Sequence, residues 1–285
     1  MDHVVQLSGG AGSWAASHRV IDRYGPENVT LLFADVKIED EDLYRFLDEM
    51  EVDLGVPITR IAEGRTPWEV FADVKYLGNT RIDPCSRILK RDFLRAYLEE
   101  NFDPASTVVY LGIDWTEEHR FKNAKTRWEP WEVRAPLCDP PYLDKNEVLA
   151  AMRERGIEPP RLYELGFAHN NCGGFCIKQG QAGFKNLLEK MPHRYDEHAR
   201  KEQELREFLG KDVSILRDRT MKGRAAAVGA TPEDVVQYGD RLIVGRTGRT
   251  VPPLVPLTLM ELRDRVNEGS DNTDPHDIGG CGCVA

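Results

Sequence analysis

The sequence predicts an α/β fold: a doubly wound sheet of five parallel strands, Rossmann-like, with a smaller C-terminal segment. Short apolar segments alternate with amphipathic helical ones over the first 112 residues, as in consecutive βαβ units. A glycine-rich turn directly follows the first apolar segment, and open parallel sheets bind ligands at that end of their strands. We expect a nucleotide-binding domain over residues 1–210 and a small segment with a mobile cysteine-containing tail over residues 211–285.

The expected strands are short and rich in Val, Ile, Leu and Phe, as buried parallel strands are. They are Val4–Leu7, Val29–Ala34, Pro57–Ile61, Thr107–Gly112 and a last one near Val133–Leu137. Residues 113–142 change character, with several tryptophans and a proline-rich end, and we interpret this region as a long active-site loop around the last strand.

Helical periodicity marks the segments between the strands. Apolar residues spaced three and four apart give each of these segments one apolar face, and Asp144 with Glu147 has the spacing of a capping box. The expected helices are Trp14–Tyr24, Asp40–Gly55, Arg87–Asn101, Asp144–Gly156 and the charged segment Leu187–Gly210.

Composition bounds the class of protein. A net charge of −10 argues against a broad nucleic-acid footprint. No apolar run approaches the roughly 20 residues of a membrane helix, and the N-terminus does not resemble a signal peptide. We therefore expect a cytoplasmic protein without a membrane partner, and leave a homo-oligomer open. The six cysteines are more typical of thiols, metal ligands or redox groups than of a disulfide framework.

The glycine-rich turn reads Ser8-Gly9-Gly10-Ala11-Gly12-Ser13. Backbone N–H groups and the dipole of the following helix favour an anion there, and glycine permits positive φ. Ser8 and Ser13 add hydroxyl donors. The turn predicts a site for a nucleotide phosphate or pyrophosphate, and the alternative is an ordinary strand-to-helix turn. No lysine follows the glycines, which excludes the Gly-x-x-x-x-Gly-Lys phosphate loop.

A second motif is Cys172-Gly-Gly-Phe-Cys176, in which two thiols four residues apart can turn onto one metal or cluster. Cys85, at a helix start, is the candidate third ligand. Three cysteines on a [4Fe-4S] cluster would leave one iron open, whereas four Cys or His ligands would suit structural Zn²⁺, with His169 or a tail cysteine as the fourth. The alternative is a set of unrelated thiols, and we interpret Cys138 as a core thiol.

Charged residues follow two strands and the first cysteine. Asp35 ends the second strand, where a carboxylate can contact a ribose, an adenine amino group or Mg²⁺, or can simply cap the next helix. Asp114 ends another strand and, with Glu117, His119 and Arg120, places a carboxylate and basic groups at the same rim of the sheet. Arg87 and Lys90 can neutralise a phosphate or sulfate, or can be solvated surface charges. Cys281, near the chain end, can swing over a site and attack or deliver sulfur.

Together these residues resemble the PP-loop ATP pyrophosphatases, the adenine nucleotide α-hydrolase-like group that includes phosphoadenosine phosphosulfate (PAPS) reductases. The resemblance covers about residues 1–210 and has four parts in order. They are Ser8–Ser13 as the PP-loop, Phe33-Ala34-Asp35, Pro84-Cys85-Ser86-Arg87 with Leu89-Lys90, and Arg161-Leu162-Tyr163 through Cys172 and Cys176. Gly280-Cys281-Gly282 is similar to the tail Glu-Cys-Gly of the reductases.

The resemblance implies an enzyme that takes ATP or an adenine sulfonucleotide with Mg²⁺. In one mechanism ATP adenylates a substrate with release of pyrophosphate, and sulfur is then transferred. In the other, the Cys281 thiol attacks the sulfur of a sulfonucleotide. Implied partners are a sulfur donor or thiol reductant protein and a nucleic-acid or small-molecule acceptor. A nucleotide-binding module of a modification or defence complex is the third alternative.

Two departures from the family pattern matter. Gly12 stands where an aspartate is often found, so Asp35 or Asp114 would have to hold Mg²⁺. The chain also has one cysteine at Cys85 and a Cys-x-x-x-Cys, where the Fe–S reductases have a cysteine pair and a Cys-x-x-Cys.

Overall fold

The computed structural model describes residues 1–79, 81–271 and 273–279. Within it the chain divides into two compact units. The first holds Met1–Val74 and Asp83–Lys178, and the second holds Lys75–Ile82 and Gln179–Gly279. Cys281 and Cys283 lie outside the described residues. None of the helices in the described ranges has the length and apolar character needed to cross a bilayer.

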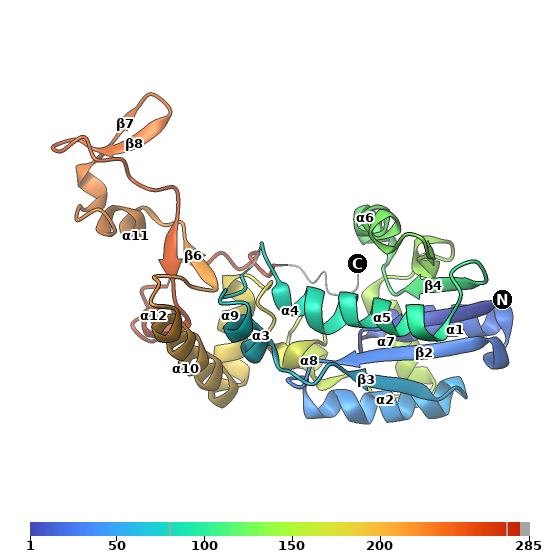
Figure 1. Cartoon of the computed structure of the whole chain (residues 1–285). Coiled ribbons are helices and arrows are strands. Elements are labelled where there is room, and N and C mark those ends of the chain that lie inside the picture. Colours follow the sequence, from blue (N-terminus) through green and yellow to red (C-terminus); the bar gives the residue numbers. More distant parts are fainter. Residues whose placement is uncertain (80, 272, 280–285) are drawn as a thin grey trace. The chain divides into compact units, whose positions relative to one another are not determined.

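The first unit is built on a five-stranded parallel sheet in the order β3-β2-β1-β4-β5, the doubly wound order that the sequence predicts (Figure 1). Its strands are β1 Asp2–Leu7, β2 Val29–Asp35, β3 Ile58–Ala62, β4 Thr107–Leu111 and β5 Glu132–Arg134. The strand order reverses between β1 and β4, and open α/β sheets bind ligands at the carboxyl ends of the strands flanking such a point. The glycine turn after β1 lies there.

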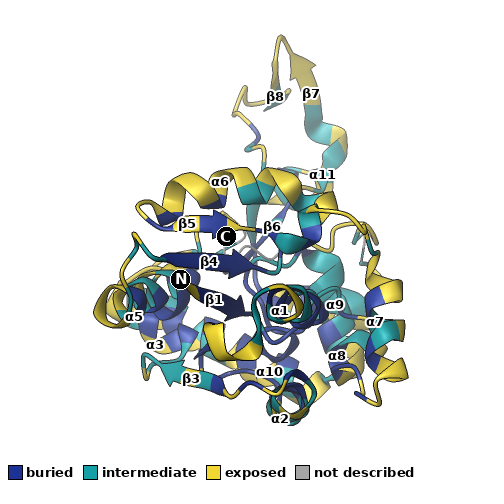
Figure 2. Ribbon diagram, turned by 90° about the vertical axis from the view of Figure 1, so that its right-hand side faces the viewer, coloured by how far each residue is buried: buried dark blue, intermediate teal, exposed yellow. Residues whose placement is uncertain are grey.

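Helices cover both faces of the sheet because its side chains alternate between two apolar clusters. Val5 and Phe33 pack with α1 Ala11–Tyr24, α2 Glu41–Leu54 and α7 Lys145–Glu154. Their neighbours Val4 and Leu32 pack with α5 Phe93–Asn101 and α6 Glu118–Trp128. The two clusters bury the central strands almost completely, as Figure 2 shows by the dark blue of β1 and β4.

Local signals place the helix ends as predicted. The Asp40 carboxylate accepts a hydrogen bond from the N–H of Asp42 at 3.0 Å and starts α2, and Gly55 ends it at φ 64°. Asp144 and Glu147 form the predicted capping box at the start of α7.

Residues 113–142 are not one long loop, so this prediction was wrong. The segment contains α6, whose sequence is strongly charged and which buries only Ala124 and Trp128, so the periodic signal is weak. Figure 2 shows the largely exposed surface of α6. The last strand ends at Arg134, because Pro136–Cys138 forms a turn of 3-10 helix instead.

Two other helices differ from their predictions. Residues 84–101 form α4 Pro84–Ser86, a π-helical turn over Arg87–Asp92 (η2) and then α5, rather than one regular α-helix. The predicted helix Leu187–Gly210 is two helices, α9 Gln181–Lys190 and α10 Pro192–Leu209, because Pro192 begins a new helix.

The second unit packs α9 and α10 against α12 Leu259–Asn267. The boundary between the units therefore falls ahead of residue 210. Inside this unit the buried Glu202 carboxylate accepts hydrogen bonds from the N–H groups of Ile215 (2.8 Å) and Leu259 (2.6 Å). Its other elements are β6 Leu216–Asp218 paired with β9 Val255–Leu257, α11 Met221–Ala226, and the hairpin of β7 Val235–Tyr238 and β8 Arg241–Val244.

The remaining short elements complete the chain. They are α3 Pro67–Asp73, α8 Arg161–Glu164, and the 3-10 turns η1 Pro26–Asn28, η3 Trp115–Glu117, η4 Pro136–Cys138, η5 Cys172–Gly174 and η6 Pro232–Asp234.

Candidate functional site

The glycine loop, residues 8–13, joins β1 to α1. Gly9 adopts φ 75°, the left-handed region that favours glycine, and a Cβ there would lie 2.6 Å from Cδ1 of Leu43. Gly10 has extended backbone, but a Cβ there would lie 2.8 Å from the Tyr163 hydroxyl. A side chain at either position would therefore collide with a neighbouring side chain, which explains why glycine occupies both.

Hydrogen bonds fix the first turn of α1. The Ser13 hydroxyl is buried and donates to the Gly10 carbonyl at 2.8 Å, so it closes the loop. The N–H of Ala11 donates to the Tyr163 hydroxyl at 3.0 Å. The N–H groups of Ser13 and Trp14 donate to the Gly10 carbonyl, at 3.1 and 3.3 Å. The dipole of α1 favours negative charge at this end of the helix.

Two side chains from distant segments hold the loop in place. The Asn170 amide is buried and donates to the Gly9 carbonyl at 2.6 Å. Arg161 donates both Nε and Nη2 to the buried Asp40 carboxylate, at 2.8 and 3.0 Å, which anchors α8 and thereby Tyr163. The residues around 161–170 thus form one wall of the loop.

The end of β4 forms the other wall. A Cβ on Gly12 would lie 2.9 Å from the carbonyl oxygen of Gly112, so the two backbones pass in direct contact. Asp114 follows and accepts from the N–H and hydroxyl of Thr116 through Oδ1, at 2.8 and 2.5 Å. Asp114 thus caps η3, at the same edge of the sheet as the glycine loop.

Asp35 lies buried at the end of β2. Its Oδ1 accepts from the N–H of Lys37 (2.8 Å) and the Tyr44 hydroxyl (3.0 Å), and Oδ2 pairs with the Lys37 ammonium at 3.0 Å. Lys37 takes the left-handed φ of 62°, and these bonds hold that turn. Asp40, not Asp35, caps the following helix.

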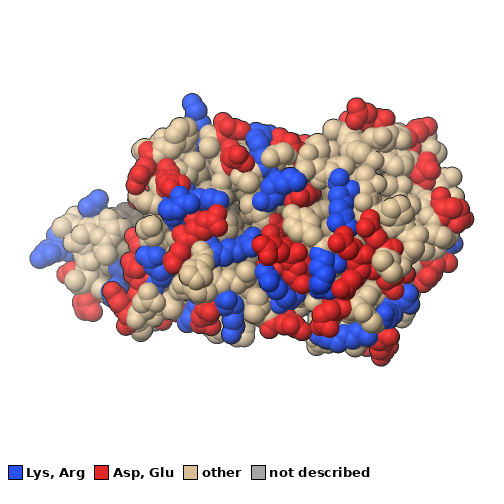
Figure 3. Space-filling view, turned by 90° about the horizontal axis from the view of Figure 1, so that it is seen from below, with Lys and Arg blue, Asp and Glu red and all other residues tan. Residues whose placement is uncertain are grey.

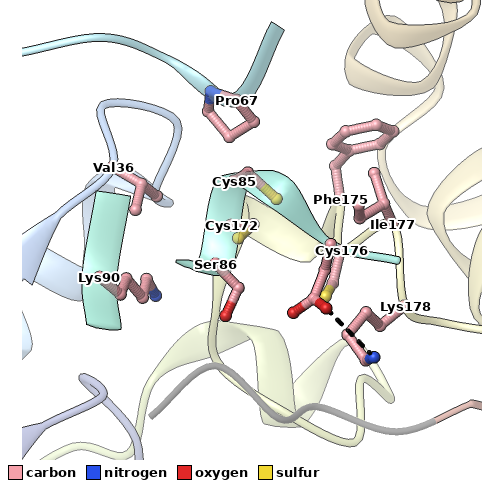
Figure 4. Close-up of a pocket in the computed structure, with 11 residues that line it drawn as sticks. Val36, Pro67, Cys85, Ser86, Lys90, Cys172, Phe175, Cys176, Ile177 and Lys178 are labelled. Carbon is pink, nitrogen blue, oxygen red and sulfur yellow. Dashed lines mark ion pairs between the residues drawn. The ribbon is translucent and has the colours of Figure 1, made fainter. Parts of the chain in front are cut away.

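The three cysteines that the sequence singles out line one pocket. Cys85, Cys172 and Cys176 lie on its wall together with Ser86 and the buried Lys90 (Figure 4). Its apolar lining comes from Val36, Pro67, Phe175 and Ile177. The cavity volume is about 20 Å³, which is room for about one water molecule. We call it the thiol pocket.

Cys172 has a strained backbone. Its φ of 48° is left-handed, and Gly173 and Gly174 continue at 57° and 81°. Non-glycine residues are held in this region only where surrounding structure requires it, and such residues cluster at functional sites. Across the pocket, the Lys178 ammonium pairs with Asp83 at 3.7 Å, the dashed line in Figure 4. This ion pair joins the segment before Cys85 to the segment after Cys176.

The two predicted cations separate. Lys90 is buried in the wall of the thiol pocket and pairs with the buried Glu39 at 3.4 Å. Arg87 is exposed and pairs with Asp92 at 3.8 Å, away from the pocket lining. The π-helical turn includes both residues, and turns of this kind are frequent at functional sites.

The thiol donors fit an iron–sulfur cluster or zinc in kind, because three soft ligands line one pocket with apolar walls. Within the described ranges, no three His, Cys, Asp or Glu side chains already surround a common metal position. Cys138 lies elsewhere, 3.6 Å from the Ile113 carbonyl, and burial raises the pKa of its thiol to about 11. It is the core thiol that the sequence predicts.

Lys145, which the sequence did not single out, lies beside the glycine loop. Its ammonium stands 4.3 Å from the centre of the Tyr163 ring and donates to the Ala168 carbonyl. Desolvation lowers the pKa of Lys145, while the charges of Asp114 and Glu117 act in the opposite direction. It places a cation near residues 8–13, which contain no charged side chain.

Sequence reasoning missed Lys145, Asn170 and the role of Tyr163. Tyr163 belongs to a segment that resembles the family, but nothing in that segment indicates its role. Asn170 belongs to no periodic or spaced pattern. A pair of adjacent amides, Asn170-Asn171, directly before the cysteine motif was the one available hint, since buried amides need hydrogen-bond partners.

Among solved structures, the chain is similar to phosphoadenylyl-sulfate (PAPS) reductase from Candida auris in its phosphate complex, with 15% identity and a TM-score of 0.39. That alignment covers 59% of this chain and 79% of the other. NMN synthetase from Francisella tularensis aligns with 19% identity over 55% of this chain and 62% of the other, also with a TM-score of 0.39. No protein-family model and no curated protein matches the chain.

Proposed function

We propose that this protein is a PP-loop enzyme that binds the phosphates of ATP on the glycine loop, adenylates an acceptor and transfers sulfur to it. An acceptor oxygen attacks the α-phosphorus, pyrophosphate leaves, and a sulfur nucleophile then displaces AMP. Positive φ at Gly9 and the helix start at Ala11 support phosphate binding. Asp35 and Asp114, at the ends of strands flanking the glycine loop, are the proposed ligands of the accompanying Mg²⁺.

The observation that carries the sulfur part is the linkage between the two sites. Asn170 bonds to the Gly9 carbonyl, and Cys172, two residues later, lines the thiol pocket. Val36 of the pocket follows Asp35 directly in the chain. Two residues span at most about 7 Å, so the thiols lie within one short segment of the proposed nucleotide site.

Cys85, Cys172 and Cys176 are the proposed ligands of a [4Fe-4S] cluster, which when bound would offer an open iron to a sulfur species. Lys90 and Lys178 line the same pocket, and each is paired with a carboxylate, Glu39 and Asp83 respectively. Apolar walls from Val36 and Phe175 limit water, which strengthens these electrostatic interactions.

The first experiment is anaerobic purification with a visible spectrum and analysis of iron, sulfide and zinc. Wild type and Cys172→Ser are compared, with Cys138→Ser as the matched control outside the pocket. We expect iron and acid-labile sulfide in wild type and in the Cys138 variant, and their loss from Cys172→Ser. Stoichiometric zinc would assign the thiols a structural role, and a metal-free protein would remove the cluster from the proposal.

The nucleotide part is tested separately by release of AMP and pyrophosphate from ATP and by binding of a non-hydrolysable ATP analogue. Gly9→Ala and Ser13→Ala should abolish product formation, and unchanged turnover in both would refute the proposal. Release of sulfite from a sulfonucleotide, lost in Cys281→Ser, would instead favour the reductase. Tight ATP binding without turnover, together with a captured partner protein, would favour the binding module.

A further inference from the structure

Two large exposed aromatic rings lie close together in the segments that follow β4 and β5. Trp115 is 46% exposed and Tyr142 is 55% exposed. Their ring centres lie 5.9 Å apart at an interplanar angle of 54°. We call them the aromatic pair. Rings of this size normally bury their faces, and exposed apolar surface next to polar groups is typical of a binding site.

The aromatic pair is held by hydrogen bonds. The indole Nε1 of Trp115 donates to the Leu143 carbonyl at 3.3 Å, next to Tyr142. Arg19, on α1, donates to the carbonyls of Pro136 (2.7 Å), Asp139 (2.8 Å) and Pro141. These bonds tie the segment before Tyr142 to the helix that starts at the glycine loop. A ligand would meet rings already in position, which lowers the entropic cost of binding.

Two short stretches of chain lead from the aromatic pair to residues that contact the glycine loop or its neighbours. Trp115 follows Gly112, whose carbonyl packs against Gly12, by three residues. Lys145 follows Leu143 by two residues and stands over the ring of Tyr163, which bonds to Ala11. The loop, the Lys145 cation and the aromatic pair therefore belong to one edge of the sheet.

We infer that the aromatic pair binds a planar, electron-poor nitrogen heterocycle of a small-molecule acceptor, with Lys145 facing the acceptor's anionic group. The inference rests on the proposed function, because it names the class of acceptor for that site. The faces of Trp and Tyr rings carry negative charge density, which complements an electron-poor ring. Base stacking on such rings tolerates different heterocycles.

Charge favours a small molecule over a nucleic acid. The chain carries a net charge of −10, and the Lys145 ammonium stands 4.3 Å from the centre of the Tyr163 ring. Figure 3 shows Lys and Arg side chains interspersed with Asp and Glu on the face that it displays, rather than a stripe of one sign.

The test uses two planar probes and neutral saturated counterparts: uridine against 5,6-dihydrouridine, and nicotinamide against cyclohexanecarboxamide. Binding is measured by calorimetry with a non-hydrolysable ATP analogue present. We expect at least one planar probe to bind about tenfold or more tightly than its saturated counterpart. Trp115→Leu should abolish that difference and Trp115→Phe should keep most of it. Tyr142→Ala should weaken the planar probe alone.

The inference would be overturned if neither planar probe bound more tightly than its saturated counterpart, or if the preference survived in Trp115→Leu and Tyr142→Ala. It would also be overturned if a single-stranded RNA outcompeted the small probes. Affinity for the ATP analogue is measured without probes in each variant and should not change. Normal analogue binding without ring preference would refute only the aromatic pair. Ring preference without analogue binding would refute the proposed function instead.

Discussion

Two glycine-rich turns in the first unit, residues 8–13 and 172–174, differ in what occupies the left-handed backbone position. In the glycine loop, Gly9 occupies the left-handed position and side chains are excluded by Leu43 and the Tyr163 hydroxyl. In the turn 172–174, the first left-handed position is occupied by Cys172, a residue with a side chain. The first turn presents backbone and the second presents sulfur.

The difference agrees with the roles proposed for the two turns. Where a ligand must approach backbone N–H groups, a Cβ is an obstacle, and glycine meets both the conformational and the steric requirement. Where the ligand must meet a thiol, the side chain is indispensable, and the structure tolerates a backbone strain of about 1–2 kcal/mol at that residue. Both turns contain Gly-Gly, so their composition alone does not reveal this contrast.

The most severe way to break the first turn is Gly9→Ala. Its methyl group would combine a φ of 75° with a 2.6 Å approach to Leu43, so the loop must shift. We expect a loss of affinity for an ATP analogue of about 100-fold, measured by calorimetry.

Gly55→Ala is the matched control. Gly55 is also left-handed, at φ 64°, but a Cβ there meets nothing within 4 Å. It should cost about 1 kcal/mol of stability and leave nucleotide affinity intact. Equal losses of affinity in both variants would show that global destabilisation, rather than the loop, is being measured.

Asn170→Asp tests the connection between the turns. The amide that donates to the Gly9 carbonyl is replaced by a carboxylate that repels it, in a buried position next to the proposed phosphates. We expect a loss of nucleotide affinity of about tenfold or more. Perturbed metal content as well would show that the turns are coupled, and an unchanged affinity would contradict the placement of Asn170.

Gly10→Ala and Tyr163→Phe form a double-mutant cycle. The added Cβ would lie 2.8 Å from the Tyr163 hydroxyl, so the clash should disappear when that hydroxyl is removed. We expect the double variant to bind the ATP analogue about five- to tenfold more tightly than Gly10→Ala alone. Additive effects would mean that the hydroxyl does not set the requirement for glycine.

Cys172→Gly gives the smallest and most instructive effect. Removing the Cβ from a φ of 48° relieves about 1 kcal/mol of strain, which the chain entropy of glycine and the loss of a buried side chain oppose. The unfolding free energy of the metal-free protein should therefore change by less than about 1 kcal/mol, measured by thermal denaturation. The variant should hold no metal. Cys172→Ser keeps the strain and loses the thiol, so it should show no stabilisation.

Much of the fold could be predicted because its signals are local. The caps at Asp40 and Asp144, the glycine loop and the apolar strands each follow from a few adjacent residues. The grouping of Cys85 with Cys172 and Cys176 came from thiol chemistry and family resemblance, and the three residues do line one pocket.

What could not be predicted depends on distant contacts. Lys145 and Asn170 act through Tyr163 and Gly9, partners that only the folded chain brings near. Helix α6 was not predicted because it buries too few residues to produce a helical period of apolar residues in the sequence. Arg87 and Lys90 looked equivalent in sequence, and the π-helical turn that separates their environments has no recognisable composition.

The π-helical turn makes the number of residues in this segment important for the position of Cys85. A π-helical turn is an α-helix with one inserted residue, so deleting one position between Arg87 and Asp92 would restore regular winding. Everything ahead of the deletion, Cys85 included, would rotate by about 100° relative to α5. The position of Cys85 in the lining of the thiol pocket therefore depends on the number of residues between Cys85 and α5. A comparison of residue identities would overlook that dependence, whereas a comparison of segment lengths would reveal it.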